Sequence, residues 1–110
     1  MEQFDIWLAN LNPSRGNEPG KVRPVVIIQT DLLNDVHPTV IICPVTTQVQ
    51  PDADILRVYL SPNQLDEPSD IMVDQIRSID KKRLIKKIGR LKKEQVRLLK
   101  KNISILLEMY

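Results

Sequence analysis

The sequence is poor in the residues on which most metalloproteins and many enzymes depend. It has one cysteine, Cys43, and one histidine, His37, among 110 residues, which speaks against a zinc site built from such ligands. Cys43 lies in an aliphatic run, which favours a reduced core residue over a reactive thiol. A glycine-rich phosphate loop, a dinucleotide fingerprint and a Ser/His/Asp set are all missing. We therefore expect no metal and no other cofactor.

Long hydrophobic runs are missing as well. No apolar stretch approaches the about 20 residues needed to span a membrane, and no charged-then-apolar leader precedes a cleavage site. A hydrophobic content of 42% over 110 residues suits one small globular domain, residues 1–110. We therefore expect a single cytoplasmic domain without membrane contacts.

The net charge is only +2, but it is unevenly distributed along the chain. Residues 1–80 carry five Lys/Arg and twelve Asp/Glu, whereas residues 81–110 carry eleven and two. A basic end of this kind suits a polyanion or an acidic protein partner. On charge alone, a solvated helix face explains the pattern equally well.

Short apolar runs separated by turn residues predict a mainly β protein. We expect strands at residues 5–9, 25–29, 39–45, 55–60, 71–79 and 84–91, with helical turns at 30–34 and 80–83. The one clear helix is predicted over residues 93–109. Strands at this spacing are typical of a small antiparallel barrel, so the sequence predicts such a barrel followed by a C-terminal helix.

The predicted helix has apolar residues on two sides. Leu98 and Ile105 fall together on nearly the opposite side from the main stripe, either as isolated surface residues or as a contact with another chain. The main stripe is expected to pack on the barrel, and it consists of Val96, Leu99, Ile103, Leu106 and Leu107.

The predicted strands are arranged around one stretch of the sequence, residues 20–29. Four consecutive aliphatic residues, 25–28, predict a strand buried on both faces, with Gly20 and Pro24 at its entry. Pro24 cannot donate a ladder hydrogen bond, so we expect it at the first residue of the strand or on an edge. Arg23 then lies at the mouth of the strand, where its guanidinium either binds a phosphate or closes a salt bridge to a nearby acid.

Three further groups of polar residues stand out, and the first two can offer polar groups to a ligand. The first lies near the tip of an unusually long loop, residues 10–21. The second follows a buried strand and is either a donor cluster or ordinary edge polarity, and the third interrupts a predicted strand, where it needs polar partners. In chain order the groups are Asn17 and Glu18; Thr46, Thr47 and Gln48; Asp74 and Gln75.

Five blocks of sequence resemble, in order, the MazF/PemK family of toxins from bacterial toxin–antitoxin pairs. They are WLANLNP (7–13), GNE (16–18), VRPVVII (22–28), PVTTQ (44–48) and DQIRSID (74–80). The resemblance covers nearly the whole chain. It implies an SH3-like barrel with a C-terminal helix, assembled as a homodimer and neutralised by a cognate MazE-like antitoxin. It also implies a sequence-specific endoribonuclease that cuts single-stranded RNA without a metal.

The resemblance also implies roles for individual residues. Arg23 and Thr46 match the catalytic arginine and threonine of the family. Met72 stands where the PemK-like branch carries an arginine that helps catalysis, so the chemistry is expected from Arg23 and Thr46, as in the MazF branch. Positions that match the RNA groove are Asn17, Glu18, Lys21, Thr47, Gln48, Asp74 and Gln75.

The implied reaction needs no nucleophile from the protein, because the 2′-hydroxyl of RNA attacks the phosphorus. The protein must align that hydroxyl and stabilise charge on the phosphoryl oxygens, and the products are a 2′,3′-cyclic phosphate and a 5′-hydroxyl end. Proton transfer stays open, with Glu18 and Asp74 as candidates.

Two other functions are considered. A CcdB-like toxin would inhibit DNA gyrase without nuclease activity, and Arg23 would then be structural. A degenerate family member would only bind RNA or the antitoxin, but the presence of both Arg23 and Thr46 argues against this.

Overall fold

The computed structural model describes residues 1–13, 15–18 and 20–109. Its seven-stranded antiparallel sheet has the order β4-β5-β3-β2-β1-β7, and β6 pairs with β3 beside β5. The strands are β1 (Asp5–Asn10), β2 (Val22–Ile27), β3 (Thr39–Thr46), β4 (Arg57–Leu60), β5 (Ser69–Met72), β6 (Arg77–Asp80) and β7 (Leu84–Arg90). The helical elements are α1 (Asp31–Asn34), α2 (Pro62–Leu65), η1 (Val73–Gln75), η2 (Lys81–Arg83) and α3 (Lys93–Leu106).

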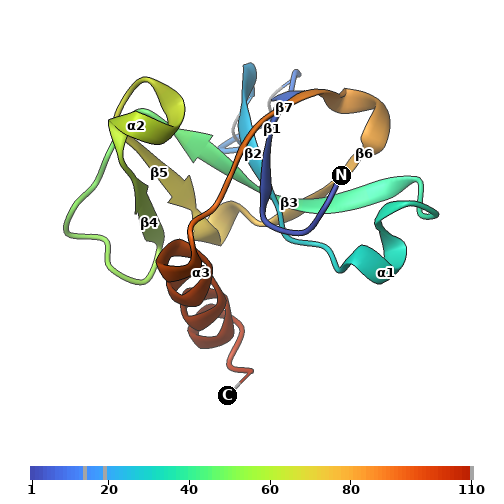
Figure 1. Ribbon diagram of the computed structural model, residues 1–110. Coiled ribbons are helices and arrows are strands. Elements are labelled where there is room, and N and C mark those ends of the chain that lie inside the picture. Colours follow the sequence, from blue (N-terminus) through green and yellow to red (C-terminus); the bar gives the residue numbers. More distant parts are fainter. Residues whose placement is uncertain (14, 19, 110) are drawn as a thin grey trace.

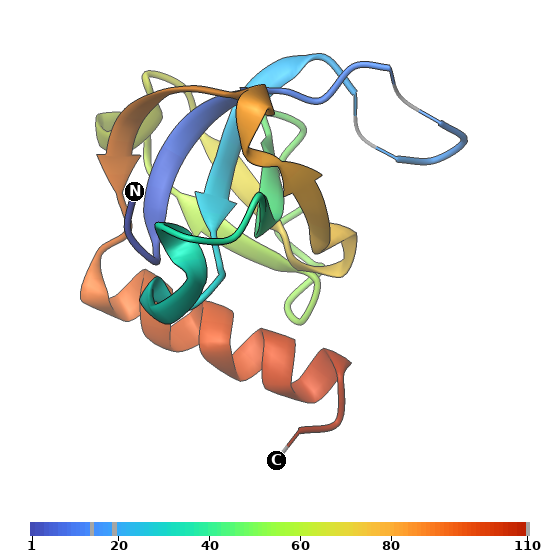
Figure 2. The ribbon, with the colours of Figure 1, turned by 90° about the vertical axis from the view of Figure 1, so that its right-hand side faces the viewer.

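The sheet curls into a barrel-like body, and α3 packs against one side of it (Figure 1). Figure 2 shows α3 crossing one end of this body, while the loop after β1 projects from the opposite end. Within the described residues no ladder joins β4 to β7, so the barrel is open at that seam. The predicted mainly β fold with a C-terminal helix is confirmed, with the correction that the barrel does not close. No helix in the described ranges has the length and apolar character needed to cross a membrane.

The strand β2 is buried on both faces, as predicted. Val26 joins a core cluster that packs against α3, whereas Val25 and Ile27 join a second cluster on the other face. At Pro24 the strand pairs only with β1, because the ladder to β3 begins at Val25. Pro24 is therefore not the first residue of the strand, but the strand is unpaired on its second side there, and the missing N–H leaves no gap in a ladder.

The strand predicted over residues 71–79 is wrong, because it is two strands separated by η1. Val45 pairs with Ile71 and Ile42 pairs with Arg77, so three steps along β3 correspond to six on the opposite side. The extra residues form the three-residue helix η1, which contains Asp74 and Gln75. Their polar side chains therefore leave the ladder instead of facing a core, which is why a continuous strand does not form.

The C-terminal helix also differs from the prediction. It ends at Leu106, and Leu107 is 50% exposed. Leu98 was predicted as an exposed residue opposite the main stripe, but it packs against the core cluster and is therefore not an isolated surface residue. The helix α3 lies beside β4 at the open seam, and the loop before β4 faces the same side of the helix. The partly buried face of α3 is therefore broader than the single stripe that was predicted.

The buried carboxylate of Asp5 ties the start of the chain to β7. It accepts hydrogen bonds from the Glu2 N–H at 2.8 Å and from Arg90 Nη1 at 2.9 Å, and Lys87 Nζ lies 3.3 Å away. Burial by itself raises the pKa of Asp5, but the Glu2 N–H, Lys87 and Arg90 together hold it below its usual value of 3.8. Asp5 is therefore ionised at neutral pH.

Cys43 is a core residue, as predicted. It is fully buried on β3, and burial, followed by the nearby charge of Asp74, raises the pKa of its thiol to about 12. The thiol is therefore protonated and unreactive at neutral pH.

Candidate functional site

A pocket of about 390 Å³ opens where β2 and β3 diverge. Five of the residues singled out from the sequence meet in it, namely Lys21, Arg23, Thr46, Thr47 and Gln48. The remaining wall is formed by Val22, Pro24, Val45, Arg57 and Met72. Of the described residues that line it, none carries a carboxylate or an imidazole, so the pocket is positively charged.

The strand register brings Arg23 and Thr46 together. Val25 pairs with Pro44 on the last ladder step between β2 and β3, and continuing that register places Arg23 opposite Thr46. Directly opposed residues of antiparallel strands project from the same face, and this is the face turned away from α3. Pro24 has no N–H to continue the ladder, so the strands separate and leave the pocket between them.

Arg23 is a partly desolvated cation without a counter-charge in the described structure. Its Nε donates to the Gly20 carbonyl at 2.9 Å and its Nη1 to the Val45 carbonyl at 3.4 Å. Burial lowers the pKa of Arg23 from its ordinary value, although an arginine remains protonated at neutral pH. The two carbonyls fix the plane of the guanidinium but leave its charge uncompensated, which suits the binding of an anion. The salt-bridge alternative is not observed among the described residues.

The loop that supplies Gly20 is fixed at its stem. Asn12 Oδ1 accepts a hydrogen bond from Lys21 N at 2.7 Å, and Leu11 N donates to the Lys21 carbonyl at 2.8 Å. Lys21 has a φ of 68°, a conformation that side-chain-bearing residues adopt only when their surroundings impose it. Arg83 from η2 donates to the carbonyls of Asn10 and Asn12. These contacts preorganise the backbone on which Arg23 rests.

The opposite wall is a tight turn after β3. Thr46 Oγ1 accepts a hydrogen bond from Gln48 N at 3.1 Å, and the Thr47 carbonyl accepts one from Val49 N at 3.1 Å. Because the Thr46 oxygen accepts within the turn, its own O–H hydrogen is available to a ligand. Thr47 and Gln48 are exposed, so the turn offers further hydroxyl and amide donors beside Arg23.

The other sequence candidates lie outside the lining of this pocket. Asn17 and Glu18 are exposed on the long loop, and Glu18 Oε2 lies 3.7 Å from Arg77 Nη1 on β6. Asp74 and Gln75 lie in η1. A strand of RNA extends beyond a single phosphate pocket, so their contacts with RNA stay a prediction. In the described ranges, no group of three His, Cys, Asp or Glu side chains is placed to hold a metal ion.

Arg57 is a pocket residue that the sequence did not indicate. It begins β4, where alternation alone gives no reason to single it out from Tyr59 two residues later. Its partner Asp70 lies on β5, directly opposite Thr46. Arg57, Asp70 and Thr46 come together only because β5 lies between β3 and β4 in the sheet.

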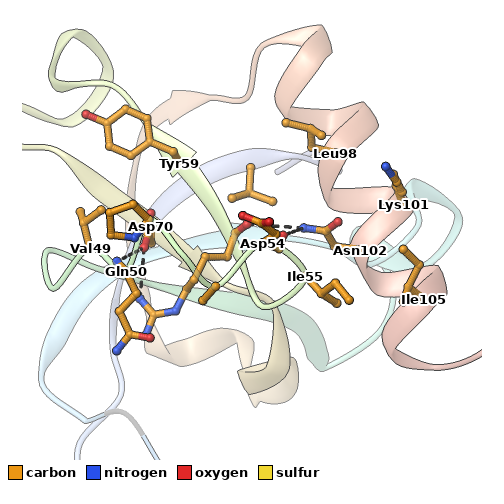
Figure 3. A pocket seen from close by; sticks show the side chains of 14 residues that line it. Val49, Gln50, Asp54, Ile55, Tyr59, Asp70, Leu98, Lys101, Asn102 and Ile105 are labelled. Carbon is orange, nitrogen blue, oxygen red and sulfur yellow. Dashed lines mark hydrogen bonds and ion pairs between the residues drawn. The ribbon is translucent and has the colours of Figure 1, made fainter.

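A second, larger hollow lies beside α3. It measures about 580 Å³ and separates β4 and the loop before it from the helix. Figure 3 shows Leu98 and Ile105 of α3 on one side and Tyr59 and Val49 on the other. Its walls are mainly apolar, and Tyr59 is 51% exposed.

Comparison with known proteins gives one consistent family. A family model described as PemK-like, MazF-like toxin of type II toxin–antitoxin system matches residues 2–107. The chain is 37% identical over 113 aligned residues to Endoribonuclease MazF of Staphylococcus saprophyticus, and the alignment covers 100% of this chain and 93% of that protein.

Solved structures show the same fold. Mycobacterium tuberculosis toxin MazF-mt6 matches with a TM-score of 0.80 and 25% identity over 94% of this chain and 96% of that one. MazF from Deinococcus radiodurans has a TM-score of 0.86 and 21% identity over 99% of this chain and 97% of that one. A MazE–MazF structure from the same organism has a TM-score of 0.81 and 20% identity, with coverages of 100% and 97%.

Proposed function

Because the chain belongs to the PemK-like, MazF-like toxins of type II toxin–antitoxin systems, we propose that it cuts single-stranded RNA at the Arg23 pocket. The curated relative is an endoribonuclease at 37% identity over the full chain, which supports this activity. One observation supports this proposal most strongly. Arg23, which is partly desolvated and has no counter-charge among the described residues, faces the hydroxyl-bearing turn at Thr46 in a pocket whose described lining holds no acid.

The reaction uses the 2′-hydroxyl of RNA as the nucleophile. The 2′-oxygen forms a bond to phosphorus, the bond from phosphorus to the 5′-oxygen breaks, and one proton moves overall from the 2′- to the 5′-oxygen. The products are a 2′,3′-cyclic phosphate and a 5′-hydroxyl end. Arg23 stabilises the charge that develops on the phosphoryl oxygens, and Thr46 adds a neutral donor from the facing strand end. Since Glu18 and Asp74 lie outside the pocket lining, the protein contributes mainly alignment and charge stabilisation.

The CcdB-like alternative predicts a structural Arg23. The partly buried Arg57 in the same pocket has a carboxylate partner, Asp70, which compensates its charge. Arg23 has only carbonyl partners in the described residues, and the curated relative is an endoribonuclease. Both observations favour RNA cleavage over inhibition of gyrase.

The protein acts as a homodimer and is neutralised by a MazE-like antitoxin. Homodimer interfaces have apolar cores, and the groove beside α3, with half-exposed Tyr59 and Ile55, has that character. An acidic antitoxin segment needs a surface of the opposite sign, which residues 81–110 supply with eleven Lys/Arg against two Asp/Glu. The complex of a structural neighbour with MazE supports an antitoxin partner.

We place the protein in the cytoplasm, where its RNA substrate is found.

The dimer proposal is tested with Ile105→Lys. Ile105 lines the groove, whereas its neighbour Leu98 also packs on the core, so a change at Ile105 is the cleaner probe. Sedimentation should show a dimer for the wild type and a folded monomer for the variant. A monomeric wild type of 12.7 kDa at micromolar concentration contradicts the proposal.

The nuclease proposal is tested on a long defined RNA with mapping of the cut ends. Once a cleaved site is known, a matched oligonucleotide with a single 2′-deoxy substitution just before the cut phosphate should bind but not be cut. The parent RNA should be cut in excess EDTA and should leave a 2′,3′-cyclic phosphate. Cleavage of the deoxy substrate, or loss of activity with EDTA, contradicts this mechanism.

A further inference from the structure

Arg57 lies between the two hollows described above. It lines the Arg23 pocket and also the groove beside α3. Its side chain is 15% exposed, and that of its partner Asp70 is 3% exposed. Arg57 is therefore not a solvated surface charge, and its position is set by its contacts within the protein.

The Arg57–Asp70 pair holds the turn after β3 at two points. Arg57 Nη1 donates to the Gln48 carbonyl at 3.0 Å and to Asp70 Oδ2 at 3.3 Å. The same Asp70 oxygen accepts a hydrogen bond from Gln50 N at 2.8 Å, which Figure 3 shows as a dashed line. The pair thus fixes the backbone on both sides of Val49.

The turn fixed in this way is the one that carries the Thr46 hydroxyl. Thr46 Oγ1 accepts from Gln48 N, so the direction of its remaining O–H depends on where Gln48 sits. Asp70 is directly opposite Thr46 in the β3–β5 ladder, so the anchor and the donor share one piece of sheet. Without the anchor, the exposed residues 47 and 48 have only local hydrogen bonds to hold them.

We propose that Arg57, held by Asp70, is a positioning residue for RNA cleavage, which it supports by fixing residues 46–50 so that Thr46 meets the reacting phosphate. This inference rests on the proposed function of the Arg23 pocket. A displacement of about 1 Å in a positioned group can cost a hundredfold in rate, so the anchor matters to catalysis without touching RNA.

The contacts favour positioning over a direct phosphate contact. The Nη1 group is shared between a carbonyl and a carboxylate, and Asp70 compensates the guanidinium charge. Arg23, on the other side of the pocket, has no such compensation among the described residues. A phosphate therefore gains more by binding Arg23.

The test uses variants that avoid a buried, unpaired charge. Arg57→Met with Asp70→Asn removes both charges together, because removing the arginine alone leaves a buried carboxylate unpaired. Arg57→Lys keeps the charge but loses the planar fork. The matched control is Arg97→Ala, which removes an exposed arginine whose partner is Glu94 on the same helix face.

The double variant should stay folded by thermal melting and should lose up to about a hundredfold in kcat, but no more than Thr46→Ala loses, with Arg57→Lys in between and Arg97→Ala at the wild-type rate. The RNA affinity of the double variant should have the same salt dependence as that of the wild type. In a Thr46→Ala background the double substitution should cost little more, because both changes act through the same hydroxyl.

Three results overturn the inference. They are an unchanged kcat in the folded double variant, a loss that simply multiplies with that of Thr46→Ala, and a salt slope reduced by about 0.7, which signals a lost phosphate contact. A wild type that cuts no RNA rejects the proposed function itself. A cleaving wild type with an equally fast double variant rejects only the role of Arg57.

Discussion

Two arginines face one pocket, and they are held in opposite ways. Arg57 has a buried carboxylate, Asp70, beside it, whereas Arg23 is fixed by the carbonyls of Gly20 and Val45. Both are partly shielded from water, but only the charge of Arg57 is balanced within the described residues. The difference indicates that Arg57 serves the folded protein and Arg23 is kept for an external anion.

Substitution of Arg23 should produce the largest change in activity. Losing one preorganised donor to a developing oxyanion typically costs about 2.7–4 kcal/mol, a hundred- to thousandfold in kcat, and Arg23→Ala should lose at least that, because it also removes a charge. Its stability should stay close to that of the wild type, since no buried carboxylate loses its partner. Single-turnover cleavage and urea unfolding measure the two quantities. A loss of activity that follows a loss of stability would assign Arg23 a structural role.

Substitution of Arg57 should lower stability as well as the cleavage rate, because its buried partner Asp70 loses its cation. Arg57→Ala leaves the carboxylate of Asp70 buried without its cation, and we expect a loss of about 3 kcal/mol in the free energy of unfolding, the low end for breaking a buried pair. Adding Asp70→Asn should restore part of it. Urea denaturation measures the free energy of unfolding. A change below about 0.5 kcal/mol for Arg57→Ala, as at an ordinary surface site, contradicts the view that Asp70 needs Arg57 as its counter-charge.

Thr46 provides a weaker donor on the Arg57 side of the pocket. Thr46→Ala removes a neutral donor and should lower kcat by about ten- to a hundredfold, less than the substitution of Arg23. Thr46→Ser is the matched control, because it keeps the hydroxyl and should retain most of the activity. Single-turnover rates on the same RNA compare the variants, and a serine variant as slow as the alanine variant excludes the hydroxyl as the cause.

Asp5 extends the comparison to a second buried acid and should give the smallest effect. Its cations Lys87 and Arg90 are half exposed, so Asp5→Asn should lower stability at pH 7 by only about 1 kcal/mol. The pKa of Asp5 is lowered in the folded state, so its contribution is complete above the unfolded value of 3.8 and is lost as the pH falls through the folded value. Thermal melts from pH 7 to pH 2.5 should show the two proteins converging in acid. A constant difference contradicts this assignment.

The sequence predicted the central strands well because their burial is written in consecutive residues. The aliphatic run 25–28 fills two core clusters on opposite faces of β2, as its composition indicates. The helical turn at residues 30–34 was predicted from its capping side chains, and Thr30 accepts the backbone hydrogen bond from Leu32. The predicted turn at residues 80–83 is also present, and Asp80 caps it by accepting from the Lys82 N–H. Local chemistry suffices where the neighbours that matter are close in the chain.

The sequence failed where strand pairing decides the outcome. Asp74 and Gln75 of η1 lie between apolar residues on both sides, and only the register against β3 shows that this segment leaves the ladder. The roles of Arg57 and Asp70 depend on β5 lying between β3 and β4, which no local pattern encodes. Arg23 and Thr46 were candidates from local patterns, and their catalytic roles came from the resemblance to a family. The register now supplies the physical reason for their meeting.

Cys43 makes the chain convenient for fluorescence work. It is the only cysteine, it is fully buried, and its thiol has a pKa of about 12, so thiol-directed dyes have no native target at neutral pH. A cysteine introduced at exposed Asn63 on α2 therefore becomes the sole site of labelling. Dyes can report on assembly and RNA binding in the natural background, without first replacing a core side chain.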